Sequence, residues 1–337
     1  MKTDRDVRGT VAPAGFTLVE LLVVIAILAL LAGLLVPAVM RARASAYNAK
    51  VKSEIDMLHM ALMNYKNEYG SFPPARMKGL WNASTRRVNT GHEVYRHLVR
   101  LFPRMAENKT DNERGALTGE SPFKYMDEMS PAQALVFWLQ GFYPNQEYPL
   151  TNGQGWPPSG SRRRFFEFEE VRLYGAGPWT DAGTQEFVRR ADLRADDPRR
   201  LFPVYFTAHA NAGLPYVYFD ARCYDNANVD DTSYGARSLQ TGEASRAFPY
   251  FNSDPPLKPL WSQRHVGPET FQLIAAGADG AYGAVAAAFP RAVVIPEKSN
   301  RTIPAVTDVA AARAHQDNIT NFAGGPLLEA AKSLENR

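Results

Sequence analysis

A run of 21 residues from Phe16 to Val36 contains one charged side chain, Glu20, and no other feature constrains this 337-residue chain as strongly. At about 1.5 Å of rise per residue, a helix of this length spans roughly 30 Å, the thickness of a bilayer's hydrocarbon core. A carboxylate inside such a segment costs about 3 kcal/mol to insert, so it needs a partner that neutralises it. The run predicts a membrane-spanning helix in which Glu20 has a function.

A secretory signal peptide does not fit this segment. Such peptides have an apolar core of about 7–15 residues, followed by a cleavage site of small residues. Here the run is longer, and Pro37 to Met40 lead directly into a helical pattern, whereas residues 1–15 are polar and of mixed charge. A signal anchor with an accidental glutamate stays open as the alternative.

The hexapeptide Gly15 to Glu20, with Pro37 ending the apolar run, resembles the N-terminal signature of type IV prepilins and type II secretion pseudopilins. The resemblance implies that prepilin peptidase cuts after Gly15 and that the new N-terminal residue, Phe16, is methylated. It implies that Glu20 pairs with the N-terminal amine of a neighbouring subunit during assembly. The implied partners are prepilin peptidase, other pilin or pseudopilin subunits, an inner-membrane assembly platform and membrane lipid.

The same resemblance implies a single pass through the inner membrane, with the leader in the cytoplasm and the globular domain in the periplasm until the subunit joins a filament. Charge does not settle this orientation. Three basic residues precede the span and four follow it closely: Lys2, Arg5 and Arg8, then Arg41, Arg43, Lys50 and Lys52.

The helix is expected to continue beyond the membrane segment. No proline or glycine occurs from Ala38 to Tyr69, and apolar side chains recur there at spacings of three and four residues: Tyr47, Val51, Ile55, Leu58, Leu62, Tyr65 and Tyr69. This is the pattern of an amphipathic helix. Gly70 and Pro73-Pro74 predict its end. Pro37 is expected to kink or locally melt it, because proline removes a backbone hydrogen bond.

Weaker patterns predict the elements that follow. Helices are expected within Gly91–Pro103, after the N-cap pair Ser130-Pro131 and at Leu327–Leu334. Runs of aromatic and β-branched residues predict strands at Leu201–Ala208, Leu214–Ala221, Thr270–Ala275 and Arg291–Ile295. The cluster Arg162–Phe166, with acidic residues directly after it, is interpreted as a solvated strand of mixed charge.

Together these patterns and the resemblance predict an α+β, pilin-like fold. A long N-terminal helix, membrane-embedded in its first half, packs on an antiparallel sheet, and the domain carries a large α/β insertion. The expected divisions are a leader at 1–15, a transmembrane and assembly helix at 16–37, and an amphipathic half with its turn at 38–74. The periplasmic globular domain covers 75–337, with the insertion at about 75–264.

A second resemblance lies near the C-terminus. Phe271–Gly280 is similar to the strand and Gly-Asp-Gly loop of major pseudopilins, and Asp317–Phe322 is similar to their closing segment. In that family the intervening loop binds calcium, which prefers six to eight oxygen ligands. The resemblance implies Asp279, Asp317 and Asn318 as ligands and calcium as the cofactor. A turn at Asp279 and a cap at Asp317 and Asn318 remain an equal interpretation.

Other function classes are disfavoured. The net charge of +3 gives no indication of a nucleic-acid partner, and the single Cys223 excludes an intrachain disulfide. No metalloprotease, nucleophile-elbow, phosphate-loop or paired-cysteine motif occurs, so an enzyme is not expected. The leading hypothesis is a structural filament subunit. The alternative is a minor pilin-like protein at a filament tip, whose inserted region recognises a surface, a glycan or DNA.

Overall fold

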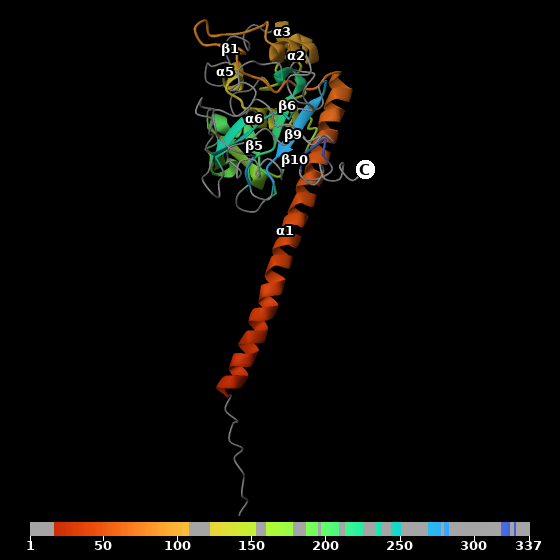
Figure 1. Ribbon diagram of the computed structural model, residues 1–337. Coiled ribbons are helices and arrows are strands. Elements are labelled where there is room, and N and C mark those ends of the chain that lie inside the picture. The colour runs from red at the N-terminus through yellow and green to blue at the C-terminus, as the bar shows by residue number, and fades with distance from the viewer. Residues whose placement is uncertain are drawn as a thin grey trace, which may run out of the picture. The chain divides into compact units, whose positions relative to one another are not determined.

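The computed structural model describes residues 17–107, 122–152, 160–177, 187–194, 197–208, 213–224, 234–237, 244–250, 269–277, 280–282, 318–323 and 327. The chain divides into two compact units, Met1–Ala46 and Tyr47–Arg337. Helix α1 (Leu18–Tyr69) begins in the first unit and ends in the second (Figure 1).

The second half of α1 forms one side of a hydrophobic core. Its buried residues are Val51, Glu54, Ile55, Leu58, Ala61, Leu62 and Tyr65. These include the central positions of the predicted stripe, which confirms the amphipathic pattern. Gly70 follows α1 with a φ of +78°, a left-handed conformation that glycine adopts without a Cβ penalty, so the predicted end of the helix is also confirmed.

The central sheet is antiparallel. One three-stranded part has the order β10 (Ile319–Thr320), β9 (Phe271–Ala275), β6 (Val217–Asp220); the other has the order β4 (Phe187–Arg189), β3 (Leu173–Ala176), β5 (Pro203–Tyr205). Beyond β5 and before β6, a bridge joins Phe206 to Pro215, and the Tyr216 amide donates to the Tyr205 carbonyl at 2.9 Å. The two parts therefore continue into each other through the β5–β6 hairpin.

Both faces of this sheet are covered at its centre, where β5, β6 and β9 are buried along their whole length. Because side chains alternate along a strand, Tyr218 and Leu273 lie in one cluster with Leu58 and Leu62 of α1, while Val217 and Ile274 lie in another. The second cluster includes the hairpin β7 (Tyr234–Arg237) and β8 (Ala244–Ala247). The sheet thus separates a helical layer from a layer that contains this hairpin.

Short helices surround the end of α1. They are α2 (Glu93–Leu101), α3 (Pro103–Glu107), α5 (Pro122–Asp127) and α6 (Pro131–Leu139), with a small β1 (Trp81–Asn82) and β2 (Arg87–Val88) hairpin. Four single-turn 3₁₀ helices complete the described elements: η1 (Glu170–Arg172), η2 (Arg190–Asp192), η3 (Pro198–Arg200) and η4 (Ala221–Cys223).

Helix α6 is the best defined of the short helices, and its start confirms the Ser130-Pro131 prediction. Ser130 and Gln133 form a reciprocal capping box, in which each side chain accepts a hydrogen bond from the backbone amide of the other residue. The Gln133 amide group also donates to the Phe202 carbonyl at 2.8 Å, which fixes the start of α6 beside β5.

The α+β prediction is confirmed, as are the strands expected at Leu201–Ala208, Leu214–Ala221 and Thr270–Ala275. Arg291–Ile295 and most of the C-terminal helix lie outside the described residues. The interpretation of Arg162–Phe166 as a solvated strand is wrong. Only Arg163 makes a bridge there, to Phe142, and Phe165 and Phe166 pack half-buried against the core, because aromatic burial dominates over the adjacent charges.

Candidate functional site: the apolar half of the first helix and its anchorage

The first half of α1 exposes an unbroken apolar surface. Its large side chains are about half or more exposed, from 46% for Val39 to 79% for Leu18. An 18-residue window has a mean hydropathy of 3.0 and no buried residue, and α1 is the one helix in the described chain that is long and apolar enough to cross a membrane. Water disfavours such a surface and hydrocarbon does not. This half of α1 therefore fits a single-pass membrane anchor.

Glu20 lies in the first turn of α1, where it forms a capping box with Thr17. The Thr17 amide and hydroxyl donate to Oε2 of Glu20 at 2.9 and 2.8 Å, and the Glu20 amide donates back to the Thr17 hydroxyl at 3.2 Å. These bonds satisfy helix-end donors that would otherwise lack partners. The spacing Thr-x-x-Glu signals this box in the sequence, although the role expected for Glu20 rested on its charge alone.

The remaining expected residues of this segment are placed as follows. Gly15 and Phe16 lie outside the described residues. Pro37 lies inside α1, which is helical without interruption from Leu18 to Tyr69. The local melting expected at Pro37 is therefore wrong for this structure, and a kink there stays a prediction. The helix continues through Pro37 and lacks one backbone hydrogen bond there, because proline has no N–H group.

A buried ion pair fixes the second half of α1 to the globular unit. Arg172, in η1, binds the Glu54 carboxylate through Nη1 and Nη2 at 2.5 and 2.6 Å, and Glu54 is only 5% exposed. The Tyr216 hydroxyl donates to the same carboxylate, and Arg172 also donates to the Phe206 carbonyl at 2.7 Å. The guanidinium lies 4.3 Å from the ring centre of Tyr205. Arg172 binds the carboxylate in a bidentate manner, and further donors of its guanidinium bind the Phe206 carbonyl, so this is a specific contact.

The turn after α1 is held by the strand β6 and its neighbours. The Tyr218 hydroxyl donates to the Pro73 carbonyl at 2.7 Å, and the Trp138 indole donates to the Pro74 carbonyl at 2.8 Å. Arg222 donates to the Phe72 carbonyl at 2.9 Å and pairs with buried Asp220 at 2.7 Å. Every residue from Phe72 to Pro74 thus has its carbonyl bound, so the turn that follows α1 is held in place.

His97 of α2 is buried against the end of α1. Its Nε2 lies 2.8 Å from the Tyr65 hydroxyl, and its Nδ1 lies 3.0 Å from Nη2 of Arg100. A guanidinium only donates, so Nδ1 accepts and the proton of the neutral ring is on Nε2. Burial, and then the charges of Arg222 and Arg100, lower the pKa of His97 from 6.5 to about 3. His97 is therefore a neutral structural contact.

Of the three implied calcium ligands, the structure describes Asn318. Its Nδ2 donates to the Tyr250 hydroxyl and the Tyr282 carbonyl at 2.7 and 2.8 Å, whereas its Oδ1 is buried without a hydrogen-bond partner among the described residues. An oxygen in this state fits a cation ligand. Asp279 and Asp317 lie outside the described residues. No cluster of metal-binding side chains occurs in the part of the chain that is described.

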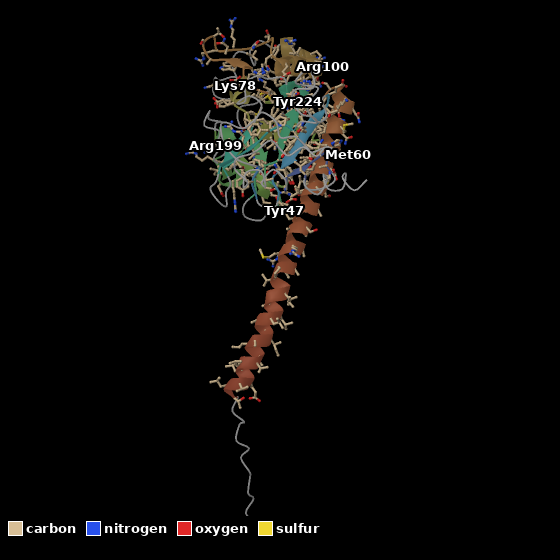
Figure 2. All side chains as sticks on the ribbon, viewed as in Figure 1. Tyr47, Met60, Lys78, Arg100, Arg199 and Tyr224 are labelled. Atoms are coloured by element: carbon tan, nitrogen blue, oxygen red, sulfur yellow. The ribbon has the colours of Figure 1, made fainter. Side chains whose placement is uncertain are left out.

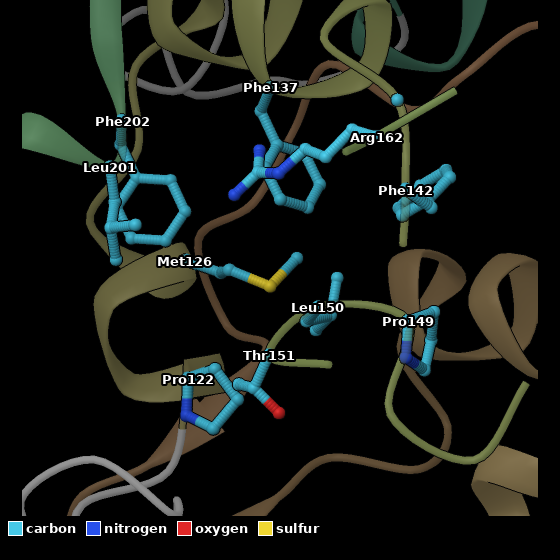
Figure 3. A pocket seen from close by; sticks show the side chains of 11 residues that line it. Pro122, Met126, Phe137, Phe142, Pro149, Leu150, Thr151, Arg162, Leu201 and Phe202 are labelled. Carbon is cyan, nitrogen blue, oxygen red and sulfur yellow. The ribbon is translucent and has the colours of Figure 1, made fainter. Parts of the chain in front are cut away.

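A small apolar cavity lies between α5, α6 and the segment Leu201–Phe202 (Figure 3). Its volume is about 20 Å³, and Met126, Phe137 and Leu150 line it. This is room for about one water molecule, too little for an organic ligand. The cavity is a packing defect of the core, and it does not indicate a binding site.

Comparison with known protein families finds one match. The family model of the prokaryotic N-terminal methylation motif matches residues 12–36, which cover most of the apolar half of α1. No curated protein and no solved structure matches the chain. A motif that directs N-terminal processing and assembly points to a structural subunit. The chain thus carries the prepilin signature, which indicates a type IV pilin-like or pseudopilin-like substrate of prepilin peptidase.

Proposed function

We propose that this chain is a structural subunit of a pilus-like filament, in a type II secretion system or a type IV pilus-like system. One observation carries the proposal: the methylation motif at residues 12–36 coincides with the membrane-capable half of α1. The bulk of the chain, Tyr47–Arg337, forms a separate compact unit, as a filament subunit with a displayed domain requires. The chain is a component of an assembly, and its apolar helix is the part that assembles.

The first step is cleavage between Gly15 and Phe16, followed by methylation of Phe16. N-terminal sequencing of the membrane-extracted chain should give a mature protein that begins at Phe16. Gly15→Val should block cutting, because a bulky side chain then precedes the scissile bond. Gly33→Val is the matched control, since Gly33 lies in the same methylation motif and an added Cβ meets nothing within 4 Å. An intact leader in the unmodified chain, or a different first residue, contradicts the proposal.

The second step is assembly through Glu20. Both bonds from Thr17 end on Oε2, and Oε1 of Glu20 has no hydrogen bond among the described residues. Oε1 is thus available to the N-terminal amine of a neighbouring subunit, and the pair would neutralise two charges in a low-dielectric surrounding. Glu20→Leu should be inserted and processed, yet fail to join filaments. Thr17→Val, which keeps the carboxylate, is the control. Normal incorporation of Glu20→Leu would exclude an assembly role.

The proposed topology places the leader in the cytoplasm and the globular unit in the periplasm, with an inner-membrane assembly platform as a further partner. Protease added to intact spheroplasts should digest Tyr47–Arg337 and leave the leader of an uncut Gly15→Val chain protected. Gold labelling of the globular unit tests the role within the filament. Labels along the whole length fit a structural subunit, whereas labels confined to the ends would instead favour a binding protein at the tip.

A further inference from the structure

The apolar surface of α1 is followed at once by two arginines. Met40 is the last exposed large apolar residue of the segment, and Arg41 and Arg43 come directly after it. Both arginines are exposed, and neither has a hydrogen bond or an ion pair within the described residues. We call these two residues the arginine pair. At the end of a membrane span, side chains of this length and charge reach the level of the lipid headgroups.

The placement of the arginine pair around the helix distinguishes between possible binding partners. Residues two apart in an α-helix are separated by about 200° around its axis, so Arg41 and Arg43 project from opposite sides of α1. A protein groove contacts one side of a helix and would meet one of them. The phosphate layer of a bilayer surrounds a spanning helix and meets both.

The charge of the arginine pair is not cancelled nearby in the sequence. No aspartate or glutamate occurs from Leu21 to Ser53, and Lys50 adds a further positive charge, whereas Lys52 is paired with Asp56 at 2.7 Å. The arginine cluster Arg162–Arg164 behaves differently, because Arg163 pairs with Glu68 at 2.8 Å and Arg164 with Glu167 at 2.7 Å. The arginine pair is thus a site of uncompensated positive charge beside an apolar surface.

We propose that the arginine pair binds the phosphate groups of anionic lipids at the end of the membrane segment. This rests on the proposed membrane insertion of α1. A guanidinium binds phosphate oxygens in a bidentate manner, and it does so better than the ammonium group of lysine. Each basic residue near an anionic membrane surface contributes a factor of about five in affinity, so the pair contributes about thirty-fold at low salt.

The experiment uses the full chain in detergent and offers it two kinds of dye-labelled vesicle. One is phosphatidylcholine alone, and the other contains about 30% phosphatidylglycerol, an anionic fraction in the range where such attraction is strong. Flotation followed by sorting of the vesicles by their dye then gives the distribution of the chain between the two kinds of vesicle. The unmodified chain should favour the anionic vesicles. Arg41→Gln with Arg43→Gln should reduce that preference about thirty-fold, and 0.5 M salt should weaken it by screening.

The matched control is Arg104→Gln with Arg189→Gln, which removes the same charge from exposed positions in the globular unit. It should leave the preference unchanged. If both double variants lose the preference for anionic vesicles equally, the net charge of the chain explains it. If the arginine-pair variant keeps the preference, the arginines do not contribute to it. Either result overturns the lipid site. Alkaline carbonate extraction of the same samples separates the two proposals. A chain that is extracted from every vesicle contradicts membrane anchoring itself.

Discussion

At the scale of single residues, Glu54 and Arg172 form a buried ion pair whose loss should strongly reduce stability. Removing one partner leaves the other charge buried, which costs about 3–5 kcal/mol, whereas replacing both by apolar residues costs far less. Arg172→Met and Glu54→Leu should each lower the free energy of unfolding by about 3 kcal/mol or more. The double variant should lose much less than the sum, as measured by urea unfolding.

The partly exposed pair of Arg190 and Glu170, joined at 3.0 Å, is the control for this cycle. Glu170 is 58% exposed, so Glu170→Gln should cost less than about 1 kcal/mol. Strictly additive losses for Glu54 and Arg172 would contradict the role of their contact.

His97 gives a pH dependence with a definite sign. Its pKa is about 3 in the folded chain and 6.5 in the unfolded chain. Between these values only the unfolded chain binds the proton, so acid favours unfolding, and stability falls by about 1.4 kcal/mol per pH unit below 6.5. His97→Gln should remove this part of the slope. Melting curves at pH 7 and pH 5 test it, and an unchanged slope in the variant would exclude His97 as the source.

Asn318 leads to a prediction about calcium. If its buried Oδ1 and the carboxylates of Asp279 and Asp317 share an ion, the ion binds only the folded chain and must stabilise it. Free calcium at about 100 times the dissociation constant should add roughly 2.7 kcal/mol, and chelator should reverse the gain. Asp317→Ala should abolish the response, with magnesium as the ion control. Melting curves that ignore calcium would favour the interpretation as a turn and a cap.

At the scale of elements, neighbouring residues of α1 provide a direct test of its packing. Leu58 is fully buried, whereas Met57 is 50% exposed and Met60, on the same outer surface, is 59% exposed (Figure 2). Leu58→Ala should cost about 2–5 kcal/mol, the range for a core leucine. Met57→Ala should stay within about 0.5 kcal/mol. Equal effects in thermal unfolding would mean that α1 is not packed as described.

The elements also show what could be predicted from the sequence. The stripe of α1 and the start of α6 were predictable, because helical spacing and capping are local patterns. The edge strand β4 was not predicted, since a strand of three residues is too short to show an alternation of apolar and polar side chains. The partner of Glu54 could not be found either, because Arg172 is 118 positions away and only the fold brings the two together.

At the scale of the whole molecule, the division after Ala46 predicts that the globular unit folds alone. A fragment that starts at Ala42 retains every buried residue of α1, since the first of these is Val51. Its melting temperature should match that of the full chain in detergent. A fragment that starts at Met60 loses Val51, Ile55 and Leu58 and should not fold. A fragment from Ala42 that fails to fold would contradict the division.

The sheet order was beyond prediction for a physical reason. Strand β6 pairs with β9 although about 50 residues separate them, and β6 belongs to the region expected as an insertion. That region therefore contributes to the central sheet itself. The processing and assembly site was easier to predict from the sequence, since the signature around Glu20 is contiguous. The calcium ligands depend on the arrangement of distant segments.

The unbroken course of α1 has a mechanical consequence. A pulling force on its apolar half travels along the helix backbone and reaches the residues from Val51 to Tyr65, which spread over roughly 20 Å of helix length. Because these residues are spread along the helix axis, which is the direction of the force, tension shears all of their contacts together and does not break them one after another. The strength of attachment is then set by these contacts acting together, and no single contact limits it.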